Sequence, residues 1–434
     1  MEDIATSCIR SIESLTDSGY PIVMSANISS YINGTYITPT VISTAYNIPT
    51  NSGANTKVGI ISLGGGWLPS DLTASLANLG LSLSQPITTV LVDGATNSWT
   101  ATNADVENTL DLYCVAGIVP SANIVIYIGQ NSLTSFANVL NRAVAEECDV
   151  ITISWTTDEN MGAGDYLSAP LANAAAKGIT VLAASGDKGS TGNDGNTGGI
   201  TVCYPASSPN VVAVGGTQLT YNSSTYQRVS ESVSIYSGGG ISTVFSVPSW
   251  QTGLKANLFF SSNGYSHVST ITGRGVPDIS APFLNYIMWF NGASNNYSIS
   301  NIALIGGTSA STPIMAGMFA RYISASGRRP IPNAIHPILY ANTSAYSDII
   351  SGNNLSYLTS GFVANVGWDP VVGLGAPIGN VVQQMVSSGG TTVKTATNTW
   401  SYLANVKVKT APTTWSNVRA IWTKVDSTTW KQTF

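Results

Sequence analysis

Residues 166–187 read YLSAPLANAAAKGITVLAASGD, a helical stretch followed by a short apolar run. The run from Gly178 to Gly186 is bounded by glycines and consists of β-branched and small residues, which is typical of a strand buried on both faces. Gly178 stands where the helical periodicity stops, and glycine commonly ends a helix. This order predicts a helix that packs on a strand of a parallel sheet.

The same unit recurs on both sides of this stretch. Further apolar runs lie at 58–63, 122–129, 149–155 and 210–216, and helical stretches lie at 70–80, 104–118 and 133–147 between them. Strands that alternate with helices favour an α/β fold: a doubly wound, mostly parallel sheet with helices on both faces. Sheets of this kind place functional residues at the carboxyl ends of their strands, which is where Asp187 stands.

Composition excludes several classes of protein. Of the 434 residues 43% are hydrophobic and only 9% are charged, against about 25% charged in an average domain. Such a chain is not intrinsically disordered, because disorder needs low hydrophobicity and high charge. Residues 1–385 hold 11 basic and 21 acidic residues, and this acidic body argues against nucleic acid as a partner. Since few carboxylates can be protonated, we expect the fold to tolerate acid.

Targeting and scaffold signals are not recognised. No apolar run reaches the roughly 18 residues of a membrane span, and MEDIATSCIR at 1–10 has no charged-then-apolar signal-peptide pattern. The four cysteines are too few for a disulfide scaffold in a chain of this length, and no CxxC pair suggests zinc.

The C-terminal tail, residues 386–434, differs from the rest of the chain. Trp400, Trp415 and Trp430 recur at intervals of fifteen, with alternating strand-like runs between them. The tail holds six basic residues and one acidic residue. We expect a small β appendage that mediates self-assembly or attachment; the alternative is a sticky, partly ordered tail.

A serine at the start of a predicted helix is the strongest candidate for catalysis. Residues 306–313 read GGTSASTP and precede a helical run at 314–324. The first turn of a helix has unpaired N–H groups and a dipole that favours a developing oxyanion, so Ser309 suits a nucleophile. The alternative is a serine that only caps the helix.

A serine nucleophile needs a base, and the two histidines are poor candidates. His336 stands beside Pro337 where a helix is expected to begin, and His267 lies in a polar loop. We expect a structural and a surface residue, respectively. A Ser-His-Asp triad of the conventional neutral-pH kind is therefore disfavoured.

Carboxyl groups are the other candidate bases. Glu107 and Asp111 are four residues apart in the helical stretch 104–118 and share one face of it. If they are buried together, they share a proton and one pKa rises, which gives a base that works in mild acid. A protonated Asp187 would donate a hydrogen bond to the oxyanion. The alternatives are a solvated acidic helix face and an ordinary turn aspartate.

Ten segments, in order, resemble the sedolisins, the serine-carboxyl peptidases, and among them the kumamolisin-like members. The segments are 57–72, 92–97, 107–112, 150–155, 183–190, 203–217, 237–251, 274–281, 306–313 and 367–379. The resemblance implies a subtilisin-like fold in which a carboxylate replaces the base histidine.

The resemblance also implies a role for each catalytic candidate. Ser309 takes the position of the nucleophile, Glu107 that of the general base and acid, and Asp111 that of the supporting carboxylate. Asp187 takes the position of the acid that stabilises the oxyanion. Because Glu107 must be ionised while Asp187 is protonated, the activity implied is an acid one.

One structural calcium ion is a further implication of the resemblance. The corresponding positions are Asp348, Ile349, Asn365, Gly367 and Asp369. Two carboxylates and main-chain carbonyls suit a hard cation that prefers oxygen ligands. The alternative is a turn network without a metal.

The chain departs from the family pattern in several places, and one is Lys188, which follows Asp187 where the family commonly has serine and, as a cation, would favour ionised Asp187. Ser62 stands where some kumamolisin-like members have glutamate, which shortens the carboxylate chain behind the pair, although Trp155 is retained. About 37 residues precede the peptidase region, where the family has a long pro-domain.

Asp194 is expected near the cleft, where it would recognise a basic substrate side chain.

These observations predict three units: an N-terminal segment at 1–37 that is a remnant of a pro-region or its substitute, a sedolisin-like peptidase domain at 38–385, and the tail at 386–434. The expected function is that of an acid-acting endopeptidase that cleaves protein or peptide substrates through an acyl-enzyme, outside a cell or on a virion. The alternative is a structural or attachment protein of the virion type that keeps the peptidase fold.

Overall fold

The structure is a computed structural model. It describes residues 36–100, 102–159, 164–192, 199–289, 302–356 and 358–387, together with two short strands near the N-terminus and six strands between 391 and 432.

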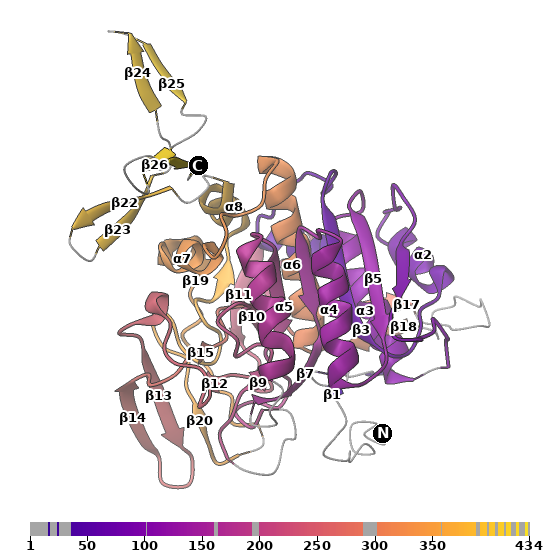
Figure 1. The fold of residues 1–434 in the computed structure, drawn as a ribbon. Helices are drawn as coiled ribbons and strands as arrows, with labels where there is room; N and C mark the ends of the chain where they lie inside the picture. Colours follow the sequence, from indigo (N-terminus) through magenta and orange to yellow (C-terminus); the bar gives the residue numbers. More distant parts are fainter. Residues whose placement is uncertain are drawn as a thin grey trace.

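A twisted, mostly parallel sheet forms the centre of the molecule (Figure 1). Its strand order is β11-β10-β8-β6-β3-β5-β4, and β16 pairs with β10 on the edge opposite β8. Only the β10–β11 pair is antiparallel. The strands are β3 (Lys57–Leu63), β4 (Thr88–Leu91), β5 (Asn123–Gly129), β6 (Val150–Ile153), β8 (Thr180–Ala184), β10 (Val212–Tyr221), β11 (Arg228–Val233) and β16 (Ile279–Pro282). The predicted doubly wound α/β architecture is confirmed.

Helices cover both faces of this sheet, and Figure 1 shows α4 and α5 in front of it. The helices are α1 (Pro39–Ala45), α2 (Pro69–Ala77), α3 (Asn103–Ile118), α4 (Leu133–Ala145), α5 (Gly164–Ala176), α6 (Thr308–Ser326), α7 (Ile335–Tyr340) and α8 (Gly379–Ser387). Neighbouring residues of β3 belong to different cores: Ile60 packs with α3 and α6, and Ile61 with α4 and α5. Successive side chains of a strand point to opposite faces, so a continuous apolar run is what a doubly covered sheet needs.

One predicted strand is in fact two. The stretch 149–155 was expected to form a single strand, but β6 ends at Ile153 and Ser154 breaks the ladder. The chain then enters β7 (Trp155–Asp158), which belongs to another sheet between β1 (Thr16–Asp17) and β9 (Cys203–Tyr204).

Short antiparallel ladders surround the central sheet. They are β2 (Met24–Ser25) with β18 (Ile302–Ile305) and β17 (Tyr286–Trp289); β12 (Gly240–Ile241) with β15 (Gly275–Val276); β14 (Tyr265–Thr270) with β13 (Lys255–Phe260) and β20 (Ser360–Phe362); and β19 (Tyr346–Ser347) with β21 (Ala376–Pro377). The N-terminal segment predicted at 1–37 thus supplies two strands, β1 and β2, to ladders of the peptidase region.

The tail contains three antiparallel hairpins, which confirms the predicted β appendage. They pair β22 (Thr391–Ala396) with β23 (Thr399–Leu403), β24 (Lys407–Ala411) with β25 (Thr414–Asn417), and β26 (Trp422–Lys424) with β27 (Trp430–Gln432). The register repeats: Trp400, Trp415 and Trp430 stand opposite Lys394, Lys409 and Lys424. The fifteen-residue period is therefore one hairpin per repeat.

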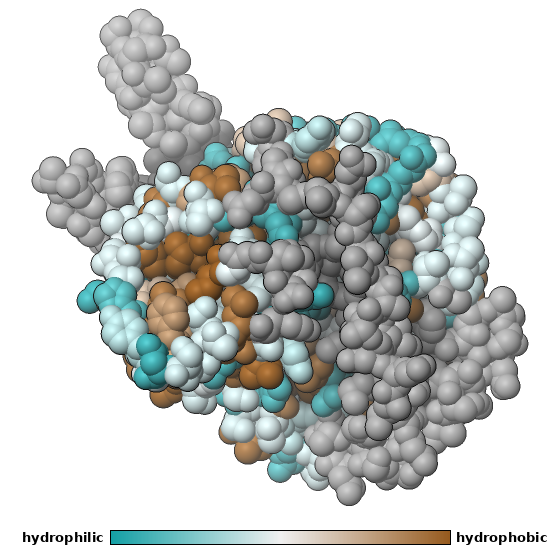
Figure 2. All heavy atoms as spheres, turned by 90° about the horizontal axis from the view of Figure 1, so that it is seen from below, coloured by the Kyte–Doolittle hydropathy of each residue, from teal (hydrophilic) through white to brown (hydrophobic). Residues whose placement is uncertain are grey.

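Within the described ranges, no helix is long and apolar enough to cross a membrane. Figure 2 views the molecule from below, the side on which Figure 1 labels β7 and β9, and shows apolar patches interleaved with polar ones.

Candidate active site

Ser309 is the second residue of α6 and is fully buried. The helix is preceded by Gly307, whose φ of 134° lies in a region that side chains other than glycine rarely adopt. A Cβ on Gly307 would also stand 2.6 Å from Oδ2 of Asp187. Glycine is therefore required for the aspartate to come this close to the start of the helix.

Asp187 is tied to the first residue of α6. It follows β8 after Ser185 and Gly186, at the carboxyl end of the strand as predicted. The Thr308 N–H and hydroxyl both donate to Asp187 Oδ1 at 2.7 Å, and Gly186 N–H donates to the Thr308 hydroxyl at 3.2 Å. The carboxyl group is thereby held one residue from Ser309, and it is 7% exposed.

Glu107 and Asp111 lie on α3, and both are completely buried. The alternative of a solvated acidic helix face is therefore wrong. Burial raises the pKa of Asp111 well above its ordinary value, and a hydrogen bond from the Ser154 hydroxyl, 2.7 Å from Asp111 Oδ1, opposes that rise. The helix begins in a capping box between Thr102 and Asp105.

The two helices that bear these residues pack closely. A Cβ on Gly317 of α6 would stand 2.7 Å from the Cβ of Ile118 on α3. Absence of a side chain at this position lets the helices approach, as small residues do at other close crossings. The approach brings the carboxyl pair toward the start of α6.

Ser154 connects the carboxyl pair with the nucleophile candidate. Its hydroxyl lies 2.7 Å from Asp111 Oδ1 and 3.4 Å from the main-chain carbonyl oxygen of Ser309. With the Thr308 bonds to Asp187, these contacts join α3, the β6–β7 break, the end of β8 and the start of α6 into one site. The structure thus brings together the regions that the sequence predicted separately.

The substitution at Ser62 leaves a neutral pair behind the site. The Ser62 hydroxyl donates to Asn108 Oδ1, and the Asn108 amide donates to the carbonyl of Gly64 at 3.1 Å. The described contacts of Ser62 therefore involve an amide and no carboxylate. Sequence reasoning missed Asn108, Ser154 and Thr308, because each acts through a partner distant in the chain.

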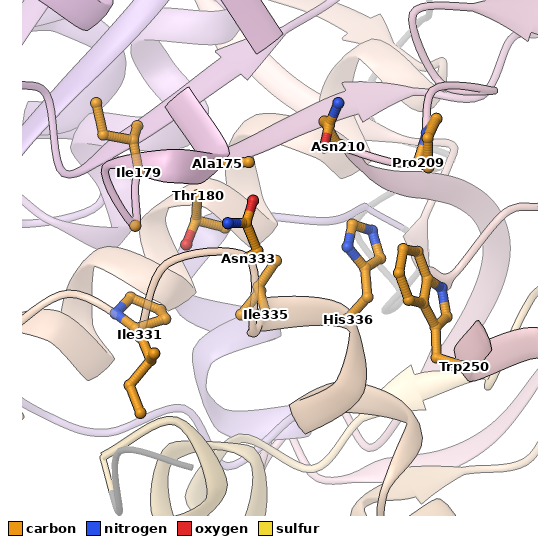
Figure 3. A pocket seen from close by; sticks show the side chains of 12 residues that line it. Ala175, Ile179, Thr180, Pro209, Asn210, Trp250, Ile331, Asn333, Ile335 and His336 are labelled. Atoms are coloured by element: carbon orange, nitrogen blue, oxygen red, sulfur yellow. The ribbon is translucent and has the colours of Figure 1, made fainter. Parts of the chain in front are cut away.

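Both histidines lie outside this site, as predicted. His267 is exposed on β14, where it stacks on Tyr265. The His336 ring has Nε2 at 2.8 Å from the carbonyl of Val211 and stacks on Trp250. It borders a small pocket of about 70 Å³ near α7, which Ile179 and Thr180 at the start of β8 also line (Figure 3).

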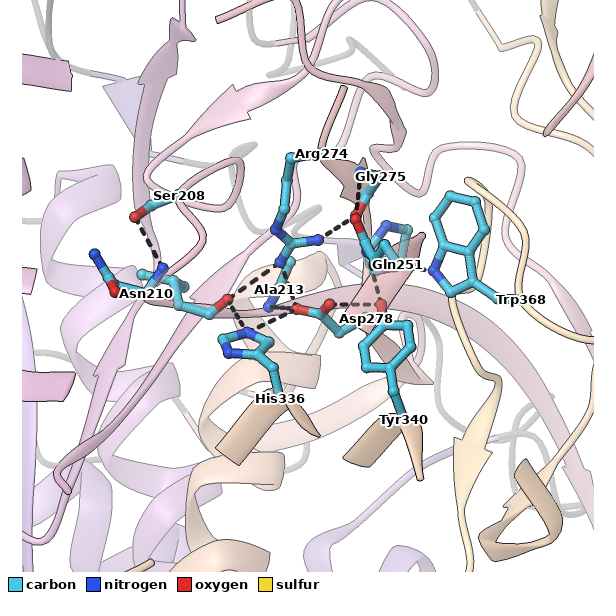
Figure 4. A network of polar contacts seen from close by, with 12 residues as sticks. Ser208, Asn210, Ala213, Gln251, Arg274, Gly275, Asp278, His336, Tyr340 and Trp368 are labelled. Carbon is cyan, nitrogen blue, oxygen red and sulfur yellow. Dashed lines mark hydrogen bonds and ion pairs between the residues drawn. The ribbon is translucent and has the colours of Figure 1, made fainter. Parts of the chain in front are cut away.

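A buried ion pair lies beside His336 (Figure 4). Arg274 Nη2 is 2.6 Å from Asp278 Oδ2, and neither side chain is exposed. The Tyr340 hydroxyl donates to Asp278 Oδ1 at 2.7 Å, and the Ala213 N–H donates to Oδ2 at 2.7 Å. Burial alone would raise the pKa of Asp278, but Arg274, His336 and the Ala213 N–H hold it well below its usual range. This cluster ties β10 and β16 to α7.

The positions predicted for calcium lie in one region. Asp348 Oδ2 accepts the Gly367 N–H at 2.8 Å, and Asp369 Oδ2 accepts the Asn365 N–H at 2.9 Å. Burial is the main cause that raises the pKa of Asp369 to about 7. Backbone hydrogen bonds from Asn365, Val371 and Val372 lower this pKa, and the nearby charge of Asp348 raises it. Ile349 is buried. No group of three or more His, Cys, Asp or Glu side chains in the described residues suggests a metal site, and Asp194 lies outside those residues.

Comparisons with known proteins find similar peptidases. The model of the subtilase family matches residues 96–344. Kumamolisin from Bacillus sp. (strain MN-32) is 36% identical over 366 residues, which are 80% of this chain and 62% of kumamolisin. Tripeptidyl-peptidase 1 of Homo sapiens is 34% identical over 244 residues, 52% of this chain and 41% of that protein. The chain thus spans less than two thirds of either relative.

A solved structure agrees with this assignment. Pseudomonas sedolisin, a serine-carboxyl proteinase, superposes with a TM-score of 0.66 at 26% identity, over 82% of this chain and all of that one. Similarity to this proteinase and to kumamolisin explains both the mostly parallel sheet and the order of the segments around Ser309. The chain belongs to the subtilase family, and within it to the kumamolisin-like sedolisins.

Proposed function

We propose that the chain is an acid-acting serine-carboxyl endopeptidase. One observation supports this most: a buried serine at the start of α6 lies in one contact network with Asp111 and Asp187, and both histidines lie elsewhere. Since a serine hydroxyl needs a base, a carboxylate is the group available.

In the proposed mechanism, Ser309 Oγ attacks the carbonyl carbon of the scissile bond while Glu107 accepts the hydroxyl proton. A protonated Asp187 donates a hydrogen bond to the oxyanion of the tetrahedral intermediate. Glu107 then gives its proton to the leaving amine, which produces the acyl-enzyme. Water, activated by Glu107, hydrolyses this ester and returns Ser309 to its initial state.

The proposed acid range follows from the two roles. Glu107 must be ionised to accept a proton, and Asp187 must be protonated to donate a hydrogen bond. Carboxyl groups meet both conditions only below neutral pH. Asp111, whose pKa burial raises, would share one proton with Glu107.

Hydrolysis of denatured casein tests the proposal. The protein should release peptides at about pH 3–5 and little at neutral pH, because Asp187 then loses its proton. Ser309→Ala protein prepared in the same way controls for contaminating peptidases. Activity that is equal in the two proteins, or a wild-type protein inactive throughout this range, would contradict the proposal.

We further propose that Asp348 and Asp369, with main-chain carbonyls of Ile349, Asn365 and Gly367, hold one calcium ion. Asp348 raises the pKa of nearby Asp369, and a divalent cation would relieve that repulsion. The ion would fix the 365–369 loop and take no part in bond cleavage.

Calcium is therefore expected to stabilise the fold. At a concentration one hundred times its dissociation constant, a ligand adds about 2.7 kcal/mol, so the unfolding temperature at pH 7 should be several degrees higher with calcium than with EDTA. Asp348→Asn should abolish the difference, whereas exposed Asp93, changed to asparagine, should preserve it. Identical unfolding temperatures with calcium and EDTA in the wild-type protein would refute the site.

The tail supports a second function, attachment or self-assembly, beside peptidase activity. Isolated two-stranded hairpins are only marginally stable in water, so three of them in succession favour association with another surface. We propose that this association occurs outside a cell or on a virion. Deletion of 388–434 should abolish oligomers without changing peptidase activity.

A further inference from the structure

The Ser154 hydroxyl has one proton and two acceptors within reach. It is fully buried at the break between β6 and β7, 2.7 Å from Asp111 Oδ1 and 3.4 Å from the Ser309 carbonyl oxygen. The shorter contact is a normal O–H···O hydrogen bond, and the longer one is weak in this arrangement. A hydroxyl can rotate, so it can donate to either acceptor and accept from a third group.

We propose that Ser154 is a positioning residue that turns its hydroxyl between Asp111 and the Ser309 carbonyl as Asp111 loses and gains a proton. This inference rests on the proposed function. When Asp111 is ionised, Ser154 donates to Oδ1. When Oδ1 is protonated, Asp111 donates to Ser154 Oγ, and Ser154 donates to the Ser309 carbonyl. Only one proton is exchanged, the one that Asp111 shares with Glu107.

The surroundings of Asp111 make this hydroxyl important. On its own helix, Asp111 has two titratable neighbours, Glu107 and Cys114, and burial raises the pKa of the Cys114 thiol so that it keeps its proton in acid. From another element, Ser154 at the β6–β7 break donates to Asp111, and the Ser309 carbonyl of α6 lies on the far side of that hydroxyl; both groups are neutral. A buried carboxyl group needs a hydrogen-bond partner both when it is ionised and accepts and when it is protonated and donates. In a state without such a partner it would bear the full desolvation cost.

Removal of the hydroxyl should affect the two states unequally. Hydrogen bonds to a charged acceptor are roughly twice as strong as neutral ones, so Ser154→Ala destabilises ionised Asp111 more than protonated Asp111. This weakens the one-proton state in which Asp111 is ionised and Glu107 carries the shared proton, so the carboxyl pair takes up its second proton at higher pH. The acid limb of the pH profile of kcat/KM should move upward by about one pH unit, while the alkaline limb, which Asp187 sets, should stay in place.

Profiles of kcat/KM against pH, measured with a fluorogenic peptide, test the inference. Ser154→Thr keeps a hydroxyl and should restore the wild-type acid limb. Ser311→Ala is the matched control: it removes another buried hydroxyl, one that donates to the carbonyls of Ala281 and Pro282, and should lower stability without moving the limb. If the Ser154→Ala variant is active and its acid limb is unchanged, the inference is overturned.

A second measurement does not depend on activity. In Ser309→Ala protein, infrared spectroscopy follows the carbonyl band of protonated carboxyl groups against pH. When Ser154→Ala is added to this variant, the pH at the midpoint of the titration of the buried carboxyl groups should rise by about one unit, as the acid limb does. Coincident titration curves would overturn the role of Ser154, whereas loss of casein hydrolysis in the wild-type protein would count against the proposed function alone.

Discussion

Ser309→Ala and Glu107→Gln are expected to lose peptidase activity to a similar extent, by about four orders of magnitude or more in kcat. Ser309 would supply the nucleophile and Glu107 the base, and neither can work without the other. The double variant should therefore be no less active than either single one. Steady-state hydrolysis of a peptide at about pH 4, with enough enzyme to detect the residual rate, measures all three.

A matched control separates catalysis from folding. The side chain of Glu231 is only 2% exposed, and it accepts hydrogen bonds from Tyr46 and Thr217, neither of which belongs to the candidate site. Glu231→Gln should cost stability but leave kcat within about threefold, because it touches no reacting group. If Glu107→Gln retained a similar fraction of activity, the general base would have to be another group.

The largest effect on stability is expected from Asp278→Asn. The substitution removes the charge that neutralises Arg274, whose side chain has no exposure to solvent. Breaking a buried ion pair by removing one partner typically costs about 3–5 kcal/mol, because the remaining charge stays buried. Denaturant unfolding at pH 7 should therefore show a large fall in the free energy of unfolding.

The pH dependence of this effect has a definite sign. The folded pKa of Asp278 lies well below its usual range, so the stability it contributes is complete above its unfolded pKa of about 3.9. The contribution is lost only as pH falls through the depressed folded value. It should thus persist through most of the proposed working range. Tyr340→Phe, which removes one hydrogen bond to Asp278, should cost only about 1 kcal/mol; an equal loss in both variants would refute the ion-pair account.

The fold could be predicted largely because local and global signals agree. Glycine-bounded apolar runs form β3, β5, β8 and β10, and the intervening helices lie within a few residues of their predicted limits. The prediction of a single strand at 149–155 was wrong because the apolar pattern continues through Ser154 without a glycine or proline. The break comes from tertiary contacts: Ser154 turns toward α3 and α6, and β7 pairs outside the central sheet.

The site was predictable in part. Ser309 and Asp187 stand where general rules place reactive groups, at the start of a helix and the end of a parallel strand. Burial of Glu107 and Asp111 could not be derived from their spacing, since the same pattern is typical of a solvated helix face; it follows from α3 being enclosed on its whole circumference. Thr308 and Ser154 were missed because hydrogen bonds between residues more than a hundred positions apart leave no local pattern.

A crystal structure of the protein with a peptide aldehyde bound at about pH 4 tests the central claim most directly. The account predicts a covalent bond from Ser309 Oγ to the aldehyde carbon, with the carboxyl group of Glu107 in hydrogen-bond reach of Ser309 Oγ and that of Asp187 bonded to the hemiacetal oxygen. A bond to another residue, or a Glu107 carboxyl group too distant from Ser309 for a direct or water-bridged contact, would contradict it.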